Sequence, residues 1–501
     1  MTTATTPEPT TGADPTPRDR GIFSRRFVLV TIGACALVFL GAFESLAVTT
    51  IMPLVSGELG GEQLYALAFA GPLAVSVIGM VAAGSVADRI GPVQPLLASV
   101  VLFLIGLLLA GTATTMWAVV AGRLVQSLGS GAMTVALYVL VARIYPPALH
   151  PRIFAGFAAA WVVPSLIGPF LAGVVAERFS WHWVFLGVVG LVVVATLLLL
   201  PALRMLRASA TERAERQAAE EESAKESGEV ATVARTGAEL RRLGWAVLVA
   251  AAVLAVNLST EFSGWTAWAL PVVGAVVAIL ALRPLIPLGT LTARRGLPTV
   301  ILVRGLTSAA FFGAEVYVPY LLTREHGLTP ALAGLALTGG AIAWSLSSWL
   351  QGRLGDRLSN ANAVQIGSSL VTVAVAIALS AALVGLPPVV PIVAWVVSGG
   401  GMGLMFPRLS VMTLAYSDER SQGFNSAAMS IGDAIGGALA LAATGLAFTA
   451  LDGSGAFAGL AWVAPGGIAF AGCFAIALVA GVVAVVVARR VSRPAEPAAT
   501  G

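Results

Sequence analysis

Charged residues are scarce in this sequence. Asp, Glu, Lys and Arg make up 11% of its 501 residues, whereas a soluble domain carries about 25%. So little charge cannot cover a surface in water, which excludes a soluble globular protein and favours a chain solvated by lipid. The basic residues stand at the ends of apolar segments and form no basic cluster, so we expect no nucleic-acid partner.

Residues that bind metals or perform catalysis are equally few. The two cysteines, Cys35 and Cys473, lie inside apolar runs as small hydrophobic side chains. The three histidines fall in separate predicted loops, and their spacing matches no metal site. The sequence also lacks a P-loop, a dinucleotide-binding glycine motif and a nucleophile elbow. We therefore predict no enzyme, no metal and no cofactor, and an ion gradient as the energy source.

Long apolar runs are what the sequence contains instead. Hydrophobic residues make up 57% of the chain, the mean hydropathy is +0.90, and there are 55 glycines. A helix of about 20 apolar residues crosses the hydrocarbon core of a bilayer. The runs are continuous and do not alternate as in a transmembrane β-barrel. The sequence predicts an all-α polytopic membrane protein, with glycine where helices approach closely.

The apolar runs predict fourteen spans in three blocks. The first six spans are 27–55, 64–88, 93–113, 116–143, 152–176 and 182–203; two follow at 243–259 and 264–286. The last six are 298–323, 329–353, 361–385, 389–416, 422–450 and 456–488. The predicted domains are a disordered cytoplasmic tail (1–26), a six-helix bundle (27–203), a charged cytoplasmic connector (204–242), two extra transmembrane helices and a loop (243–297), a second six-helix bundle (298–490) and a cytoplasmic tail (491–501).

Arginine is distributed unevenly between alternate loops. If the N-terminal tail is cytoplasmic, the arginine-rich loops all lie inside, and the other side keeps mainly Arg178 and Arg324 beside several acidic residues. This bias follows the positive-inside rule, so we predict that both termini are cytoplasmic. The richness in Ala, Gly and Val, with Lys225 as the single lysine, indicates a bacterial source. We therefore predict a multi-pass protein of the bacterial cell (inner) membrane.

Two similar hexads indicate an internal repeat. The sequence GSVADR (84–89) closes the second span of the first block, and GRLGDR (352–357) closes the second span of the last block. The same pattern at the same topological point is typical of transporters built from two halves. Such transporters hold the substrate between the halves and rock one half against the other.

Further motifs follow one another along the first six spans. The loop after span two, which contains Gly84, Asp88, Arg89 and Gly91, is similar to the pattern G-x-L-A-D-R-x-G-R-K. Span one carries Glu44 at the distance from Pro53 that separates acid and proline in D-x-T-I-V-N-V-A-L-P. In span four, Arg123 and Gln126 with the following glycines are similar to R-x-x-Q-G-x-G.

The next two motifs lie in span five and at the start of span six. Span five is similar to the antiporter motif G-x-x-x-G-P-x-x-G-G, through Pro164, Gly168, Pro169 and Gly173. The segment 181–185 (WHWVF) resembles W-R-W-x-F. Together the five motifs resemble the major facilitator superfamily, and specifically its fourteen-span drug/proton antiporter branch.

This resemblance implies a fold and a mode of action. The expected fold is the major facilitator fold, two six-helix bundles with two additional central transmembrane helices (14 spans). The expected activity is proton-coupled antiport that exports small lipophilic or cationic compounds by alternating access. The expected partners are a small-molecule substrate, protons and the lipid bilayer, and we expect the chain to function as a monomer.

Acidic residues inside the spans are the candidates for proton coupling. An ionised carboxylate in hydrocarbon costs several kcal/mol unless it is paired, so its protonation can depend on which face is open to water. Glu44 and Arg123 fall at similar depth, and we predict that Glu44 carries the proton with Arg123 as its intermittent partner. A static ion pair is the alternative. Glu315 is interpreted as a second titrating site, a charge contact for a cationic substrate, or a cavity acid without a role in turnover. Asp433 is a further proton-coupling candidate.

Other residues are assigned to a gate and to a cavity. The predicted cytoplasmic gate contains Gly84, Asp88, Arg89, Gly91, Asp356 and Arg357. The antiporter-motif helix contains Pro164, Gly168, Pro169 and Gly173, and its prolines are expected to bend span five. Candidates for the substrate cavity are Gln126, Phe311, Phe312, Tyr317 and Trp344. Arg304 and Arg408, in the inner halves of their spans, are interpreted as structural residues that snorkel to the interface.

Three other functions are compatible with parts of the sequence. A major facilitator permease or symporter for a physiological solute or lipid would share the fold but not the direction of transport. A membrane-embedded enzyme would need a convergent polar catalytic set, which the short loops and dispersed histidines disfavour. A receptor or scaffold without transport is disfavoured by the acidic residues inside the spans.

Overall fold

The structure, a computed structural model, describes residues 21–24, 27–146, 149–200, 203, 232–259, 265–354, 357–417, 422–452, 464 and 466–491. Most of the predicted N-terminal tail, most of the predicted connector and nearly all of the predicted C-terminal tail lie outside the described residues. Asp356 lies outside them too, as do the side chains of Asp88 and Arg89.

Regular structure in the described residues is entirely helical. The first group of helices comprises α1 (Val28–Glu58), α2 (Leu67–Ile90), α3 (Val93–Gly111), α4 (Met116–Ile144), α5 (His150–Arg178) and a sixth helix, His182–Leu200. Next come α7 (Thr232–Leu258) and α8 (Trp265–Leu282). The second group comprises α9 (Leu297–Glu315), α10 (Tyr317–Arg324), α11 (Pro330–Leu354), α12 (Asn360–Val384), α13 (Val389–Ala415), α14 (Gln422–Leu451) and α15 (Gly467–Ala488).

The apolar helices match the predicted spans closely. In the described residues, 13 helices are long and apolar enough to cross a membrane, with α9 and α10 counted together as Leu297–Arg324. The remaining predicted span, 264–286, coincides with α8, whose apolar part is the shorter segment Ala269–Leu285. The chain is therefore an all-helical, multi-pass membrane protein.

Three predicted boundaries differ from the structure. α7 begins at Thr232 instead of 243, because a helix can continue into water beyond its apolar run. α15 begins at Gly467 instead of 456, directly after Gly466, whose φ of 78° favours glycine. The predicted span 298–323 is broken at Val316, between α9 and α10. Pro319 explains this break, because it has no N–H to donate to the carbonyl of Glu315 four residues earlier.

The two groups repeat the same internal packing. In the first group, α1 packs on α5, and both α2 and α3 pack on α4. In the second group, α9 packs on α14, and both α11 and α12 pack on α13. Counted within each group, these are the same helix pairs, first with fifth, second with fourth and third with fourth. The repeat seen in the two hexads therefore extends to the packing of whole helices.

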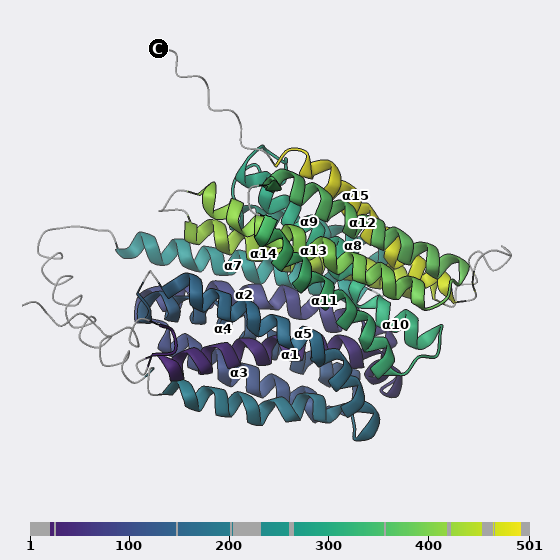
Figure 1. The fold of residues 1–501 in the computed structure, drawn as a ribbon, viewed down its shortest axis with the longest axis horizontal. Coiled ribbons are helices and arrows are strands. Elements are labelled where there is room, and N and C mark those ends of the chain that lie inside the picture. The colour runs from purple at the N-terminus through teal and green to yellow at the C-terminus, as the bar shows by residue number, and fades with distance from the viewer. Residues whose placement is uncertain are drawn as a thin grey trace, which may run out of the picture.

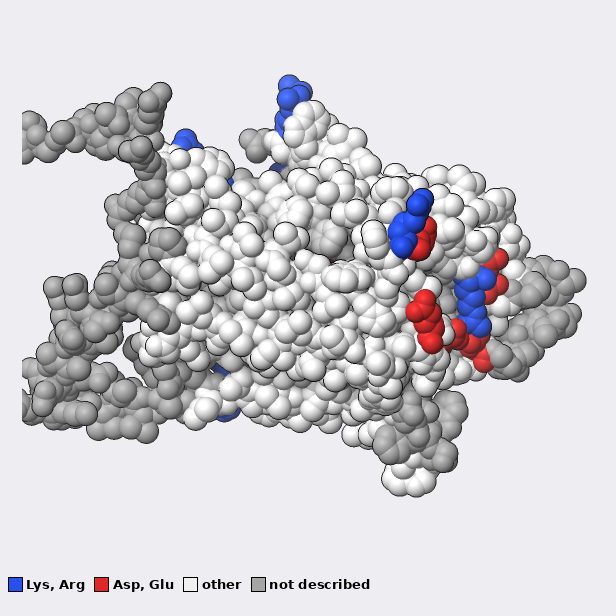
Figure 2. Space-filling model, turned by 90° about the horizontal axis from the view of Figure 1, so that it is seen from below, with Lys and Arg blue, Asp and Glu red and all other residues white. Residues whose placement is uncertain are grey.

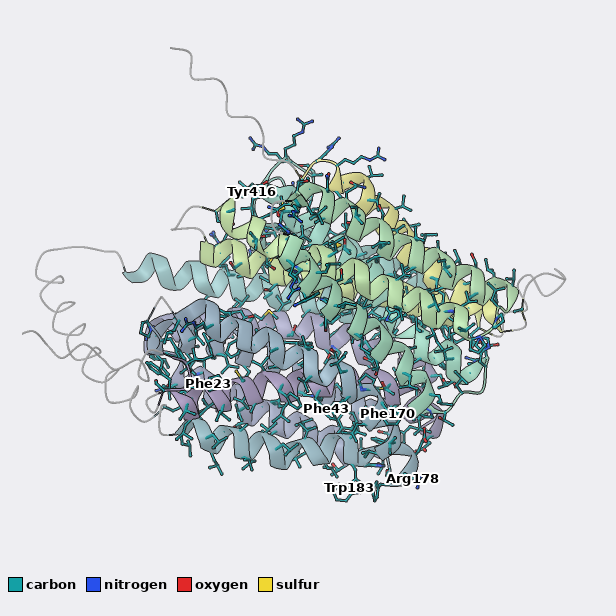
Figure 3. The ribbon with its side chains drawn as sticks, viewed as in Figure 1. Phe23, Phe43, Phe170, Arg178, Trp183 and Tyr416 are labelled. Carbon is teal, nitrogen blue, oxygen red and sulfur yellow. The ribbon has the colours of Figure 1, made fainter. Side chains whose placement is uncertain are left out.

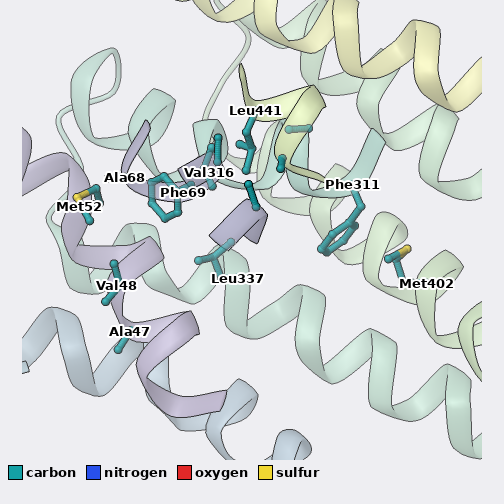
Figure 4. Close-up of a cluster of buried hydrophobic side chains, with 14 of the residues drawn as sticks. Ala47, Val48, Met52, Ala68, Phe69, Phe311, Val316, Leu337, Met402 and Leu441 are labelled. Atoms are coloured by element: carbon teal, nitrogen blue, oxygen red, sulfur yellow. The ribbon is translucent and has the colours of Figure 1, made fainter. Parts of the chain in front are cut away.

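The groups meet along two seams. α2 contacts α14 at one seam, and α5 contacts α11 at the other. α7 packs against both α2 and α14, and it lies between them in Figure 1. Apolar residues of α2, α7, α9 and α14, among them Val77, Val249, Ile301 and Ile431, form one buried cluster there. Figure 4 shows a larger cluster that also joins the groups, from Val48 and Phe69 to Phe311 and Leu337.

Glycines allow the second and fourth helices of each group to touch through their backbones. A Cβ on Gly131 of α4 would overlap the Ser76 carbonyl of α2. In the second group, a Cβ on Gly403 of α13 would overlap the Trp344 carbonyl of α11. In lipid there is no hydrophobic effect to drive helices together, so their association depends on close packing. Small residues allow that packing because they let the two backbones approach. These contacts fix the positions of α4 and α13, which carry side chains of the candidate site.

We expect Gly131→Ala to destabilise the protein. The added methyl would push α2 and α4 apart, and overpacking of this kind costs about 1–3 kcal/mol. The measurement is the apparent unfolding temperature of the purified protein. Gly187→Ala is the matched control, because a Cβ on Gly187 meets nothing within 4 Å. Equal unfolding temperatures for the two variants would contradict the close contact.

Most of the surface between the two ends of the helices is apolar. Figure 2 shows few charged residues on the side turned to the reader: the acidic residues and some basic ones gather toward the right-hand end, and further basic residues lie along the upper and lower edges. Leu191 (56% exposed), Val194 (56%) and Val272 (65%) are examples of exposed apolar side chains, as expected for contact with lipid. We call the two ends of the bundle the Glu58 end and the Val28 end, after the last and first residues of α1. In Figure 3, Phe23 and Tyr416 lie toward the Val28 end, and Arg178 and Trp183 toward the opposite end.

Candidate functional site

A buried ion pair lies at the centre of the first group. The guanidinium Nη1 of Arg123 on α4 lies 3.1 Å from Glu44 Oε1 on α1. Arg123 Nε also donates a hydrogen bond to the Ala68 carbonyl of α2 at 2.6 Å. Glu44 and Arg123 are 6% and 7% exposed. Three helices therefore converge on one charge pair, and the proximity expected from the sequence is present.

Two further side chains complete the surroundings of this pair. The Phe69 ring centroid lies 5.5 Å from the Arg123 guanidinium carbon. Gln126, one turn after Arg123 on α4, lies beside the Glu44 carboxylate. Its amide nitrogen is buried and has no hydrogen-bond partner among the described residues. The carboxylate thus has an arginine and an amide beside it, and no other described residue accepts a hydrogen bond from that amide.

Glu315 occupies a different environment in the second group. It is the last residue of α9, at the break before α10. Its neighbouring hydrogen-bonding group is the side chain of Trp395 on α13. No arginine, lysine or histidine of the described part of the chain forms an ion pair with it. The partly buried Glu315 therefore has an indole beside its carboxyl, where Glu44 has a guanidinium.

A second ion pair lies closer to the Val28 end. Arg304 on α9 contacts Asp433 on α14 through Nη2 at 2.6 Å and through Nε at 2.8 Å. Ser308 donates to the other oxygen of Asp433, and Arg304 Nη1 donates to the Phe406 carbonyl at 3.3 Å. The Arg304 guanidinium also lies 3.5 Å from the centroid of the Phe406 ring. The guanidinium of Arg304 and the carboxylate of Asp433 therefore each have an ionic partner and at least one further hydrogen bond. Arg304, which the sequence suggested would snorkel, pairs with an acid inside the bundle.

Asp433→Asn should lower the thermal stability of the protein. Arg304 would keep its charge inside the bundle without a carboxylate, and loss of one partner of such a pair costs about 1–3 kcal/mol. The double variant Arg304→Gln/Asp433→Asn removes both charges and should recover part of the loss. Unfolding temperatures of the wild type and of Asp433→Asn, Arg304→Gln and the double variant would measure this coupling. Additive effects would show that the two residues act independently.

Arginines on α4 and α13 bind the last turns of α2 and α11, the helices that end in the two similar hexads. Arg143 Nη2 donates to the Ala87 carbonyl of α2 at 3.0 Å. In the second group, Arg408 Nη2 donates to the Gln351 carbonyl of α11 at 3.0 Å, and Nε donates to Gln351 Oε1 at 2.6 Å. Both donors come from the fourth helix of their group. The structural interpretation of Arg408 from the sequence agrees with these contacts.

The residues of the predicted gate lie at the Val28 end of α2 and α11. Gly91 follows α2 with a φ of 90°, a conformation that favours glycine. Gly84 lies on α2 against Val135 of α4, and Arg357 is exposed. The contacts of Asp88, Arg89 and Asp356 fall outside the described part of the chain, so their role as a gate stays a prediction.

The antiporter-motif residues lie where α5 touches both groups. Gly168 faces Phe43 of α1, so that a Cβ there would come within 3.3 Å of the ring. Gly173 lies against the backbone of Ala331 on α11, and the Pro169 carbonyl lies against Gly334. Pro164 is buried in the same helix. These small residues therefore set the closest approach of the two groups at the α5–α11 seam.

Polar contacts join the two groups at the Glu58 end. The Tyr65 hydroxyl donates to the Val316 carbonyl at 2.6 Å. The Ala331 amide donates to Glu177 Oε1 at 2.8 Å. Arg324 contacts Glu62 across the seam at 3.8 Å, and it holds Asp452 of its own group at 2.9 Å. Burial raises the pKa of the neighbouring Glu325 carboxyl, and Arg324 opposes that shift. These contacts bridge the two groups at the Glu58 end.

Aromatic rings fill the space beneath these polar contacts. Tyr65 packs against Tyr317 and Tyr320, with centroid distances of 5.9 and 4.7 Å. Phe448 packs on both of the latter tyrosines. Tyr317, predicted from the sequence as a cavity residue, is 1% exposed and belongs to this cluster of rings.

The other cavity candidates separate into two places. Phe311, in the second group, packs against both Phe312 and Trp344, with ring centroids 5.3 and 5.6 Å away. Phe311 is 3% exposed and lies inside this cluster. Gln126 lies in the first group beside Glu44. No cluster of three or more His, Cys, Asp or Glu in the described residues is placed to hold a metal.

Sequence reasoning missed two features of this arrangement. The pairing of Arg304 with Asp433 joins residues 129 positions apart, and two opposite charges inside separate spans were its only signal. The contact between Tyr65 and Val316 involves the backbone carbonyl of the residue that separates α9 from α10. Pro319 was the signal for that break.

Comparison with known proteins identifies the family of this chain. A sequence profile of the Major Facilitator Superfamily matches residues 33–315. The Multidrug efflux pump SdrM of Staphylococcus aureus (strain N315) is 22% identical over 338 residues, which cover 66% of this chain and 70% of SdrM. The Multidrug transporter protein MdtP of Bacillus subtilis (strain 168) is 22% identical over 441 residues, which cover 86% of this chain and 77% of MdtP.

Solved structures show the same fold. The crystal structure of a D-xylose-proton symporter aligns with a TM-score of 0.63 over 93% of this chain and 98% of that one, at 13% sequence identity. At this identity the likeness concerns the fold alone.

Proposed function

This chain is a transporter of the major facilitator superfamily, and we propose that it is a proton-coupled antiporter that exports small lipophilic or cationic compounds by alternating access. The buried pair of Glu44 and Arg123 carries this proposal. The names of SdrM and MdtP, a multidrug efflux pump and a multidrug transporter, support the substrate class.

Glu44 is proposed to bind and release the transported proton. An ionised carboxylate inside a membrane is tolerated when a cation pairs with it, and Arg123 stands 3.1 Å away. When Glu44 takes up a proton, Arg123 loses its ionic partner but keeps the Ala68 carbonyl and the Phe69 ring. Movement of α1 relative to α4 would then change the free energy of protonation. Asp433, paired with Arg304, is a second candidate for the same role.

The Glu58 end is proposed to face the outside of a bacterial cell membrane, with both termini in the cytoplasm. Arg143 and Arg408 lie at the Val28 end, whereas Glu58, Glu62 and Asp452 lie at the opposite end, as the positive-inside rule requires. The contacts between the groups at the Glu58 end are proposed to close that end in a state that opens toward the cytoplasm. One chain is proposed to transport by itself, because the proposed pathway lies between the two groups of a single chain.

Transport into proteoliposomes under an imposed pH gradient tests this function. We would follow tetraphenylphosphonium, a neutral lipophilic antibiotic and a fluorescent lipid, together with the internal pH. Antiport predicts that proton movement opposes substrate movement and tracks its rate. Substrate movement that ignores the gradient would identify a facilitator, and protons that move with the substrate would identify a symporter; either result overturns the proposal.

A further inference from the structure

The first helix of each group carries one acidic residue in an equivalent place. Glu44 ends the sequence FLGAFE (39–44) in α1, and Glu315 ends the sequence FFGAE (311–315) in α9. Each follows a Gly-Ala pair by one or two positions. The helix pairs of the two groups also correspond. Glu44 and Glu315 are therefore counterparts in the internal repeat.

The partners of these two acids also occupy counterpart positions. Arg123 is the eighth residue of α4, and Trp395 is the seventh residue of α13. Both helices are the fourth of their group and run in the same direction relative to the first. The repeat thus places an arginine beside Glu44 and a tryptophan beside Glu315. The second group therefore has a counterpart of Glu44, namely Glu315, but no counterpart of Arg123.

The lack of a cation beside Glu315 distinguishes it from Glu44 and Asp433, the two acids that form ion pairs within the bundle. Glu44 has Arg123, and Asp433 has Arg304. A carboxylate left unpaired in a membrane interior costs several kcal/mol. A cation that arrives from outside the chain would remove this cost at Glu315, whereas the carboxylates of Glu44 and Asp433 are already neutralised.

Aromatic rings surround the place where such a cation would lie. Trp395 lies 4.9 Å from Phe311, which precedes Glu315 by one helical turn. Trp344 of α11 lies 5.6 Å from Phe311 on another side. The missing Cβ of Gly340 makes room for the Trp395 ring, since a Cβ there would lie 3.0 Å from Cδ1. The indole is therefore held firmly against α11.

One ring of this cluster reaches the boundary between the groups. A Cβ on Gly437 of α14 would come within 3.4 Å of Phe312 and 3.1 Å of Leu73 of α2. Phe312 is thus at the α2–α14 seam, and it is only partly buried. A ligand bound between the groups would meet Phe312 first and the ring cluster beside Glu315 behind it.

We propose that Glu315, with Trp395, Phe311 and Phe312, forms the site that receives the positive group of a lipophilic organic cation. This inference rests on the proposed export function and assigns its charge recognition to the second group. A small metal cation fits the site poorly, because Na⁺ or Mg²⁺ needs several oxygen ligands. A large, weakly hydrated cation suits one carboxylate and several ring faces.

Equilibrium binding of radiolabelled tetraphenylphosphonium to the protein in lipid nanodiscs tests the site without requiring transport. Glu315→Gln should weaken binding by about tenfold or more, because it removes a charge-assisted contact. Trp395→Arg should weaken binding to a similar extent, since it gives Glu315 an internal partner like that of Glu44. Glu58→Gln is the control, because it removes a carboxylate that contacts Trp181 at the end of α1, and its binding should match the wild type.

The outcomes separate this inference from the proposed function. Wild-type affinity in a folded Glu315→Gln or Trp395→Arg protein, judged by gel filtration and unfolding temperature, would overturn the site and leave proton-driven transport untouched. If one variant does not fold, the other decides. An absence of tetraphenylphosphonium binding by the wild type would likewise overturn the cation site. Glu315-dependent binding without proton-driven transport would support the site and refute the antiport.

Discussion

Glu44→Gln is expected to abolish proton-driven transport in proteoliposomes. Glutamine preserves the size of the side chain but neither binds nor releases a proton at neutral pH. Loss of a positioned proton-transfer group costs about a hundredfold or more in rate. Exchange of labelled for unlabelled substrate, without a pH gradient, should persist because it requires no net proton movement. The measurement is uptake rate with and without the gradient, at equal protein per vesicle.

Two further variants separate coupling from structure at this pair. Glu44→Asp keeps an acid near Arg123 and should retain a measurable response to the pH gradient. Glu44→Gln/Arg123→Gln removes both charges, so that no guanidinium is left without its carboxylate, and should restore thermal stability but not coupling. If Glu44→Gln responded to the gradient like the wild type, Glu44 would not be the proton carrier, and the static ion pair would be the better interpretation.

Tyr65→Ala is expected to shift the protein toward states that are open at the Glu58 end. Tyr65 is 2% exposed, donates to the Val316 carbonyl and packs on Tyr317 and Tyr320. These contacts join the first group to the second, so their loss weakens the closed state selectively. Loss of a buried aromatic ring costs about 3 kcal/mol or more, which corresponds to a change of roughly a hundredfold in the equilibrium between the two states.

Cysteine labelling would measure this shift. Thr50 is fully buried on α1 beside Gly334 of α11, beneath the closure. In a Cys35→Ala/Cys473→Ala background, Thr50→Cys should react slowly with a membrane-impermeant maleimide and much faster once Tyr65→Ala is added. Tyr65→Phe is the matched control, because it keeps the ring and loses one hydrogen bond, which is worth about 1 kcal/mol. Equal labelling rates for Tyr65→Ala and Tyr65→Phe would show that the aromatic packing does not close this end.

Hydropathy and spacing identified the class of the protein and most of its spans, because each apolar run must satisfy its own backbone in lipid. They also placed Glu44 and Arg123 at similar depth, which follows from the rise of a helix. The boundaries failed where a local feature overrode hydropathy, at Gly466 and at Pro319.

Only the tertiary structure decided which buried charges meet. Hydropathy reports what each helix requires from its solvent, but it does not report which neighbour a side chain faces. The sequence therefore showed Arg304 and Asp433 as separate charges, and the packing of α9 on α14 made them a pair. The same is true of Glu315, because only the packing of α9 beside α13 brings Trp395 to the position that Arg123 has in the first group.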